Sequence, residues 1–100
     1  MSILLVTYDL NRNSEKFDGQ NYAGVLKIIR EYSNTRLSES SYAIDTTETP
    51  TSIYNKVKPA LDKNDNLYVI TLSKPDTGFG KKEVNNWLEQ HLHQNIIPLD

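Results

Sequence analysis

The first residues of the chain that could do chemistry follow directly on an apolar segment. A run of aliphatic residues ends at Tyr8, and then Asp9, Asn11 and Arg12 come within four positions. A carboxylate can bind a divalent cation, and an amide or a guanidinium can bind a phosphate group. Asp and Asn are also common turn residues, because their side chains hydrogen-bond to the nearby backbone. The sequence leaves both interpretations open.

Two further groups of residues carry charge or could bind metal. Lys81 and Lys82 follow a Gly-Phe-Gly segment at the start of a predicted helix, where a bound anion is plausible. The spacing does not fit a phosphate-binding P-loop, and we expect Phe79 to pack under the loop. His91 and His93 are two apart in a helix and point in different directions, so we predict a solvated pair rather than a metal site.

The charge of the whole chain argues against a general attraction for polyanions. The chain has 11 basic and 13 acidic residues and a net charge of −2, so nucleic-acid binding would have to be local. Arg30 and Arg36 flank the junction between a predicted helix and a strand. We interpret both as solvated surface residues, because no basic stripe is visible.

Length and composition predict one domain. A chain of 100 residues can bury only a modest core, and we assign residues 1–94 to a single domain and 95–100 to a tail. There are no cysteines, so no disulfide framework or thiolate nucleophile is possible. The first apolar run is too short for a signal core or a membrane span. We therefore expect a cytoplasmic protein without a membrane partner.

Hydrophobic periodicity predicts the secondary structure. The pattern alternates between strand-like runs and apolar residues at helical spacing, with turn residues between them. The predicted elements are a strand over 2–10, a helix from Gln20 whose apolar pattern reaches Tyr32, two short strands within 35–47 with a break at 38–40, a helix capped by Thr49 and ended near Pro59, a strand over 67–72, and a helix containing Val84 and Leu92.

This order predicts an α+β fold of the ferredoxin-like type, a βαββαβ antiparallel sheet with an additional C-terminal helix. Both faces of the first strand and of the strand over 67–72 are largely apolar. An antiparallel sheet with one wet face should alternate apolar and polar residues, so something should cover the second face as well. The cover could be the last helix or a second subunit. We favour a homodimer packed through the sheet faces.

Several segments resemble a known group of proteins. The segments are "MSILLVTYDLN", "GQNY", "RLSESSYAIDT", "VKPALDKNDNLYVITL" and the stretch from "TGF" to "NNWL". Together they resemble small bacterial proteins of the SinR family, over most of the chain to about Leu92. That family is similar to the CRISPR-associated Cas-two nucleases, which are ferredoxin-like homodimers; here the similarity lies at "VTYDL".

The resemblance implies an activity and a site. The aspartate that ends the first strand in the Cas-two family is the proposed metal ligand, and Asp9 occupies that place here. A two-fold axis near this strand end would bring two Asp9 carboxylates together to bind Mg²⁺ or Mn²⁺. The implied function is a metal-dependent endonuclease acting on RNA or DNA, with Tyr8, Asn11 and Arg12 positioning phosphate. The alternatives are a non-catalytic dimeric adaptor that binds nucleic acid or protein, and a sensor of a small anion.

Overall fold

The computed structural model of the chain describes residues 2–10 and 20–93. Within these ranges the structure is α+β, with a four-stranded antiparallel sheet and three α-helices, and it is compatible with the predicted ferredoxin-like fold. The elements, in order, are β1 (Ser2–Asp9), α1 (Gln20–Ile29), β2 (Ser33–Ser38), β3 (Ser41–Thr46), α2 (Pro50–Val57), the 3₁₀ turn η1 (Lys58–Ala60), β4 (Asn66–Leu72) and α3 (Lys82–His91). The tail, 95–100, lies outside the described residues.

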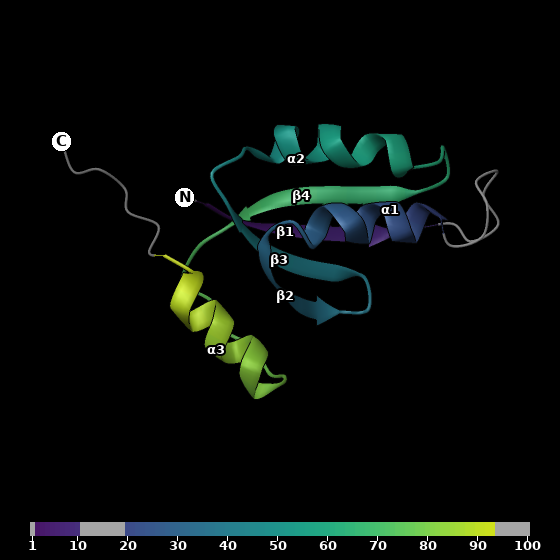
Figure 1. The fold of residues 1–100 in the computed structure, drawn as a ribbon. Coiled ribbons are helices and arrows are strands. Elements are labelled where there is room, and N and C mark those ends of the chain that lie inside the picture. Colours follow the sequence, from purple (N-terminus) through teal and green to yellow (C-terminus); the bar gives the residue numbers. More distant parts are fainter. Residues whose placement is uncertain (1, 11–19, 94–100) are drawn as a thin grey trace.

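The strand order in the sheet is β2-β3-β1-β4, and every neighbouring pair is antiparallel (Figure 1). β1 is therefore an inner strand, paired with β3 on one side and β4 on the other. Val6, for example, faces Tyr42 of β3 and Val69 of β4. A strand in this position is shielded along both edges, so its even-numbered and odd-numbered side chains must find cover above and below the sheet.

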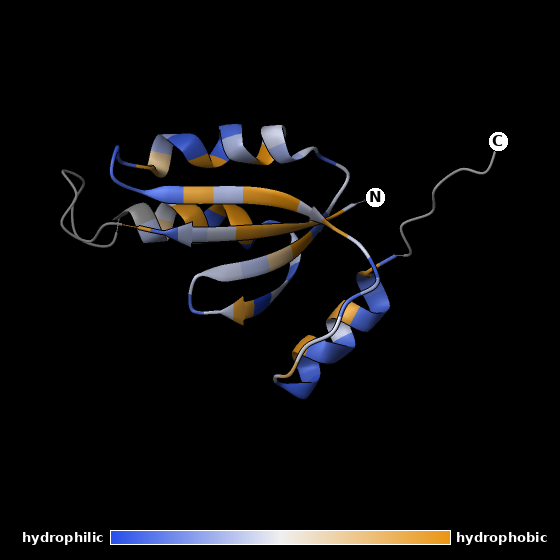
Figure 2. Cartoon of the chain, turned by 180° about the vertical axis from the view of Figure 1, so that it is seen from behind, coloured by the Kyte–Doolittle hydropathy of each residue, from blue (hydrophilic) through white to orange (hydrophobic). Residues whose placement is uncertain are grey.

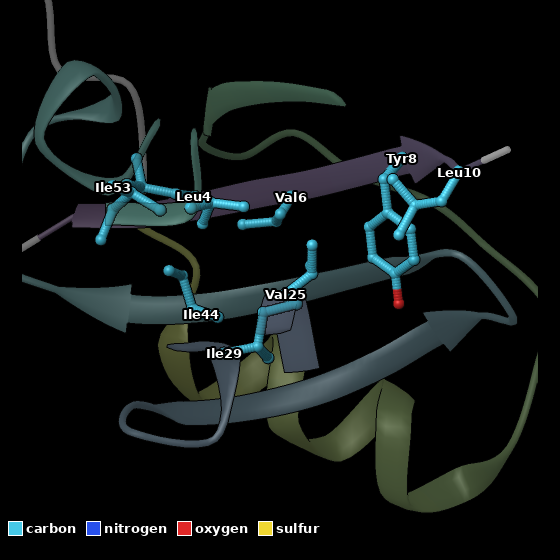
Figure 3. Close-up of a cluster of buried hydrophobic side chains, with 9 residues drawn as sticks. Leu4, Val6, Tyr8, Leu10, Val25, Ile29, Ile44 and Ile53 are labelled. Atoms are coloured by element: carbon cyan, nitrogen blue, oxygen red, sulfur yellow. The ribbon is translucent and has the colours of Figure 1, made fainter. Parts of the chain in front are cut away.

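One face of the sheet carries the main hydrophobic core. Even-numbered residues of β1 point to this face, where α1 and α2 lie against them (Figures 1 and 3). Leu4 and Val6 are fully buried, as are Val25 of α1 and Ile53 of α2. Complete burial of an aliphatic side chain of this size stabilises the fold by about 1.5–3 kcal/mol. The predicted period-2 pattern of the first strand is thus confirmed on this face.

The start and end of α2 follow from local sequence. Thr49 caps the helix, because its side-chain hydroxyl accepts a hydrogen bond of 3.1 Å from the backbone N–H of Ser52. Pro50 follows at the first helical position, where its missing N–H costs nothing. The α-helix ends at Val57, and Pro59 falls within the 3₁₀ turn that follows. The predicted cap and stop are both confirmed.

The first helix is shorter than its apolar pattern suggested. α1 ends at Ile29, and Tyr32 lies beyond it in the bend before β2. The Tyr32 hydroxyl donates a hydrogen bond to a carboxylate oxygen of Glu48, next to α2. Tyr32 still packs against the main core, so an apolar residue at helical spacing need not belong to the helix.

Within residues 2–10 and 20–93, the opposite face of the sheet is covered at only one end. α3 stands beside the end of the sheet where β1 begins (Figure 2), and its residues pack on Ile3 and Ala43. Leu92, directly after α3, completes this second cluster, in which Ile3 is only 1% exposed. The last helix of the same chain is thus one cover for the second face, one of the two possibilities that the sequence left open.

Polar contacts fix α3 and the preceding loop. The indole Nε1 of Trp87 donates to the Ser33 hydroxyl at 3.3 Å, which ties the helix to edge strand β2. Lys74 donates through its backbone N–H to the carbonyl of His93 at 2.7 Å and through Nζ to Glu89 at 2.9 Å. The hydrogen bond to Glu89 raises the pKa of Lys74 above its ordinary value. These contacts hold α3 at one end of the sheet.

The described helices leave the rest of the second face open. Tyr68 is 64% exposed and Ile70 is 49% exposed, although both lie in β4 within the sheet. Their register partners in β1 are Thr7 and Leu5, which are partly buried. We call these four residues the open sheet patch. Tyr68 is thus not a core residue of the single subunit.

None of the helices formed by the described residues is long and apolar enough to cross a membrane. The longest have 10 residues, whereas about 20 are needed for a span.

Gly24 generates a prediction about the packing of α1. A Cβ atom built at Gly24 would lie 2.6 Å from the Cβ of Ala60 in η1. Gly24→Ala should therefore lower the free energy of unfolding by about 1–2 kcal/mol, because overpacking outweighs the gain in helix propensity. Urea denaturation measures this loss. Ala60→Gly should restore much of it in the double variant, and an additive loss in that variant would contradict the contact.

Candidate functional site

Asp9 is the last residue of β1 and is exposed to solvent. Its register partner is Asn66, the first residue of β4. Strand alternation places the Asp9 side chain on the same face as Thr7 and the open sheet patch. This end of β1 is opposite to the end that α3 covers, where Ile3 is buried. The exposed carboxylate thus lies at the end of the sheet away from α3, on the face of the open sheet patch.

Tyr8 is directed to the other face, although it is next to Asp9 in the sequence. It is 4% exposed and forms one end of the main core (Figure 3), where its ring meets that of Tyr22 edge-on at 6.1 Å. Burial raises the pKa of Tyr8 above its ordinary value of 10.0, so its hydroxyl stays protonated at neutral pH. The two catalytic candidates from the sequence are therefore not on one face of the sheet.

A recess of about 420 Å³ nevertheless reaches both residues where β1 ends. We call it the strand-end recess. It lies between the end of β1, the side of α1 and the turn that joins β2 to β3. Its walls carry three tyrosines, two arginines and two carboxylate residues among others. The residues that matter below are Tyr8, Asp9, Arg30, Arg36, Glu39 and Tyr42.

Arg36 is held in place at the wall of the recess. Its Nε donates to the carbonyl of Ser38 at 3.1 Å, and its Nη2 donates to the carbonyl of Glu39 at 3.2 Å. The guanidinium also lies 6.0 Å from the centre of the Tyr42 ring, at the outer limit of a cation–π contact. A guanidinium has five N–H donors, so those not used in the turn remain for a ligand.

Arg30 follows directly on the last residue of α1, and its side chain is exposed. Among the described residues it has no ion-pair or hydrogen-bond partner for its guanidinium. A cation at a helix C-terminus is favoured by the helix dipole, which is one structural reason for its place. The interpretation of Arg30 and Arg36 as isolated surface charges missed that they border one recess. Six positions separate them in sequence, and no short motif joins them.

The other predicted phosphate ligands cannot be placed. Asn11 and Arg12 lie outside the described residues. The turn expected after Asp9 also lies outside the described residues. The described residues contain no group of three or more His, Asp or Glu side chains that could hold a metal ion. In the described part of one subunit, a cation could therefore bind to the Asp9 carboxylate, but the other ligands that it needs are not present there.

The prediction of a solvated histidine pair is wrong for His91. Its ring stacks on Trp87 with centroids 3.8 Å apart, and its Nδ1 lies 2.7 Å from the Trp87 carbonyl. Its Nε2 lies 3.8 Å from a carboxylate oxygen of Asp45. The side chain is thus part of the packing of α3 on the sheet. His93 is exposed.

The loop before α3 also differs from expectation. Phe79 is fully exposed instead of packed under the loop. A shallow groove of about 680 Å³ runs between this loop, α3 and edge strand β2, and Leu37 and Leu88 are among the residues that line it. Lys81 precedes α3 as its N-cap without a side-chain hydrogen bond. The groove is also lined by Lys81 and by Arg36, which borders the strand-end recess as well.

A charged network elsewhere in the fold has a structural role. Glu48 accepts hydrogen bonds from Lys56 at 2.8 Å, from Ser52 at 2.6 Å and from Tyr32. These hydrogen bonds lower the pKa of Glu48 to about 2, and the bond from Lys56 has the largest effect. The network connects the bend before β2 with both ends of α2, and every member is satisfied by another. We assign it to stability rather than chemistry.

Comparison with known proteins does not assign the chain to a family. No protein-family model matches the sequence, and no curated protein is significantly similar to it. The class that the fold defines is thus a small α+β protein with a four-stranded antiparallel sheet. Any function has to be argued from the residues at the end of β1.

The Glu48 network predicts a pH dependence of stability. Because the pKa of Glu48 falls from 4.5 to about 2 on folding, its ionised form contributes stability above pH 4.5. That contribution should be lost as the pH falls from about 4.5 towards about 2. Glu48→Gln should therefore lower stability at neutral pH and flatten the acid arm of the unfolding profile, measured by thermal denaturation. Glu83→Gln, an exposed acidic residue of α3, serves as the control; an identical profile for both variants would contradict the assignment.

Proposed function

We propose that the chain forms a homodimer through the open sheet patch and acts as a divalent-metal-dependent endonuclease on RNA or DNA. The observation that carries the proposal is that Asp9 ends the inner strand β1 on the same sheet face as this exposed apolar patch. The resemblance to the SinR and Cas-two families agrees with it. A cytoplasmic location belongs to the proposal as well.

The apolar patch supports the dimer. Tyr68 and Ile70 are large side chains in the middle of a strand, and water reaches about half or more of each. Aromatic residues on an exposed sheet face are typical of protein interfaces. A two-fold homodimer buries the same patch of both copies against each other. α3 leaves room for this contact, because it packs on Ile3 at the other end of β1.

The same geometry would provide a cation site. A two-fold axis passing near the end of β1 would bring Asp9 close to Asp9 of the partner subunit. Mg²⁺ is commonly bound through one or two carboxylates together with waters and substrate phosphates, so an exposed pair of aspartates fits it. When bound, such an ion supplies Lewis-acid polarisation of the phosphoryl oxygen and a water of lowered pKa. Asp9 would hold the ion, and Asn11 and Arg12 stay predicted phosphate ligands.

A non-catalytic adaptor is the second candidate. It is favoured by one observation, that the described part of a single subunit has no cluster of three metal-ligating side chains. In that case the same dimer would bind nucleic acid or protein without hydrolysis. The two candidates share the dimer and differ in the role of Asp9.

The dimer is tested by placing a charge in the open sheet patch. Ile70→Glu should convert a wild-type dimer into a monomer, because burying two unpaired carboxylates at the interface is costly. Light scattering coupled to size-exclusion chromatography measures the mass. Tyr54→Glu places a charge on an exposed aromatic of α2 and should leave the dimer intact. A monomeric wild-type protein at concentrations of about 100 μM would rule out an interface of useful affinity.

The metal site is tested by Asp9→Asn, which removes the charge but keeps the shape. Purified wild-type protein should cleave single-stranded RNA or DNA with Mg²⁺ or Mn²⁺ and stop when EDTA is added. Asp9→Asn should lower the rate at least about a hundredfold while the dimer persists. Glu83→Gln is the matched control and should cleave like the wild type. Undiminished cleavage by Asp9→Asn would refute this site, and no metal-dependent cleavage of either substrate would favour the adaptor.

A further inference from the structure

The strand-end recess is lined by a buried tyrosine whose hydroxyl forms no hydrogen bond within the described part of the fold. The side chain of Tyr8 is only 4% exposed, yet its hydroxyl has no hydrogen-bond partner among the described residues. In the described part of the chain, only Oδ1 of Asp45 is a side-chain polar atom that is both fully enclosed and without a hydrogen-bond partner. Because the Tyr8 hydroxyl also lacks a described partner, it must be reachable by solvent. The hydroxyl is directed away from β1 (Figure 3), and Tyr8 lines the recess. The hydroxyl is therefore a donor that the described protein groups leave available to a ligand in the recess.

Two cations border the same space. Arg36 is fixed by its hydrogen bonds to the turn between β2 and β3, so presenting its remaining N–H groups costs little conformational entropy. Arg30 approaches from the end of α1 and has no described partner to displace. A guanidinium group can donate two parallel hydrogen bonds to the oxygens of a phosphate. Arg30, Arg36 and the Tyr8 hydroxyl therefore bring hydrogen-bond donors from three different segments to one recess.

The acidic residues restrict which anion would bind. Glu39 and Asp9 also border the recess, so its formal charge is balanced. It would not attract every polyanion, but it can accept one phosphate whose attached sugar or base offers donors to a carboxylate. The rings of Tyr22 and Tyr42 line the walls and provide flat surfaces of the kind on which bases stack. The volume of about 420 Å³ is within the range of small-molecule sites.

We propose that the strand-end recess binds one nucleotide of a single-stranded nucleic acid, with its phosphate held by Arg30, Arg36 and the Tyr8 hydroxyl. This deepens the proposed function, on which it rests for the identity of the ligand, because it names the subsite that would hold the substrate beside Asp9. It assigns Tyr8 to phosphate binding rather than to metal binding. The binding itself does not require a cation or a cleavage step.

Binding is measured with adenosine 5′-monophosphate in the presence of EDTA, by NMR titration of the ¹⁵N-labelled protein. Shifts should be largest for the Arg30 and Arg36 side chains and the backbone near Tyr8. Adenosine, which lacks the phosphate, should cause much smaller shifts, and inorganic phosphate should bind more weakly than the nucleotide. Equal effects of adenosine and the nucleotide, or no shifts at the recess, would overturn the proposal. Tighter binding of inorganic phosphate would overturn the nucleotide assignment.

Paired variants separate the recess from general charge effects. Arg30→Gln should weaken nucleotide binding about fivefold or more, whereas Lys27→Gln, one turn earlier on α1, should leave it nearly unchanged. Tyr8→Phe should also weaken it while keeping thermal stability, because the hydroxyl has no protein partner to lose; Tyr54→Phe is its control. Glu39→Gln should strengthen the binding of inorganic phosphate, since it removes a negative charge beside the anion. Equal losses in Arg30→Gln and Lys27→Gln, or wild-type affinity in Tyr8→Phe, would contradict the proposal.

The same reagents distinguish this inference from the proposed function. If Asp9→Asn abolishes cleavage but still binds the nucleotide in EDTA, both stand. If the nucleotide binds as described but no variant or wild-type protein cleaves nucleic acid, the recess stands and the nuclease is refuted. If cleavage depends on Asp9 but kcat/KM is unchanged by Arg30→Gln and Tyr8→Phe, the nuclease stands and the recess is refuted.

Discussion

The whole structure depends on burying β1 on both of its faces. As an inner strand it pairs with β3 and β4, and its side chains leave the sheet alternately on the two sides. Leu4 and Val6 on one face and Ile3 on the other are completely or almost completely buried. One layer of helices can satisfy only one face. The chain therefore needs α1 and α2 on one side and a second cover on the other, and the position of that second cover decides what is left exposed.

α3 provides this cover only where β1 begins. Trp87 and Leu88 contribute to the cluster around Ile3 and Ala43, and the contacts of the preceding loop keep the helix there. Consequently the other half of the same face retains exposed Tyr68 and Ile70, and β1 ends in an accessible carboxylate at Asp9. The start of β1 is thus packed against α3, whereas its end carries the candidate site. A ligand or a second subunit can therefore approach Asp9 without displacing α3.

The end of β1 also connects the core with the solvent. Tyr8 closes the main core with its ring, while its hydroxyl reaches the strand-end recess. A phenylalanine would fill the same apolar space, so packing alone does not explain the hydroxyl. The turn between β2 and β3 is fixed by Arg36, whose contacts therefore connect the stability of the hairpin with the shape of the recess. Of the groups proposed to bind a ligand here, the fold fixes Tyr8 by burial and Arg36 by hydrogen bonds, whereas Arg30 and Asp9 are exposed.

Local sequence determined the elements and the face of each strand residue. Alternation placed Asp9 with Ile3 and Thr7, and the Thr49–Pro50 pair and Pro59 marked the limits of α2, because caps and fixed φ angles act within a few residues. Only the tertiary structure decided that Arg30 and Arg36 border one recess, that His91 of α3 lies beside Asp45 of β3 and that Phe79 is exposed. Those outcomes depend on which elements meet across the sheet, and contacts between distant segments are set by packing and register, which periodicity within one segment does not encode.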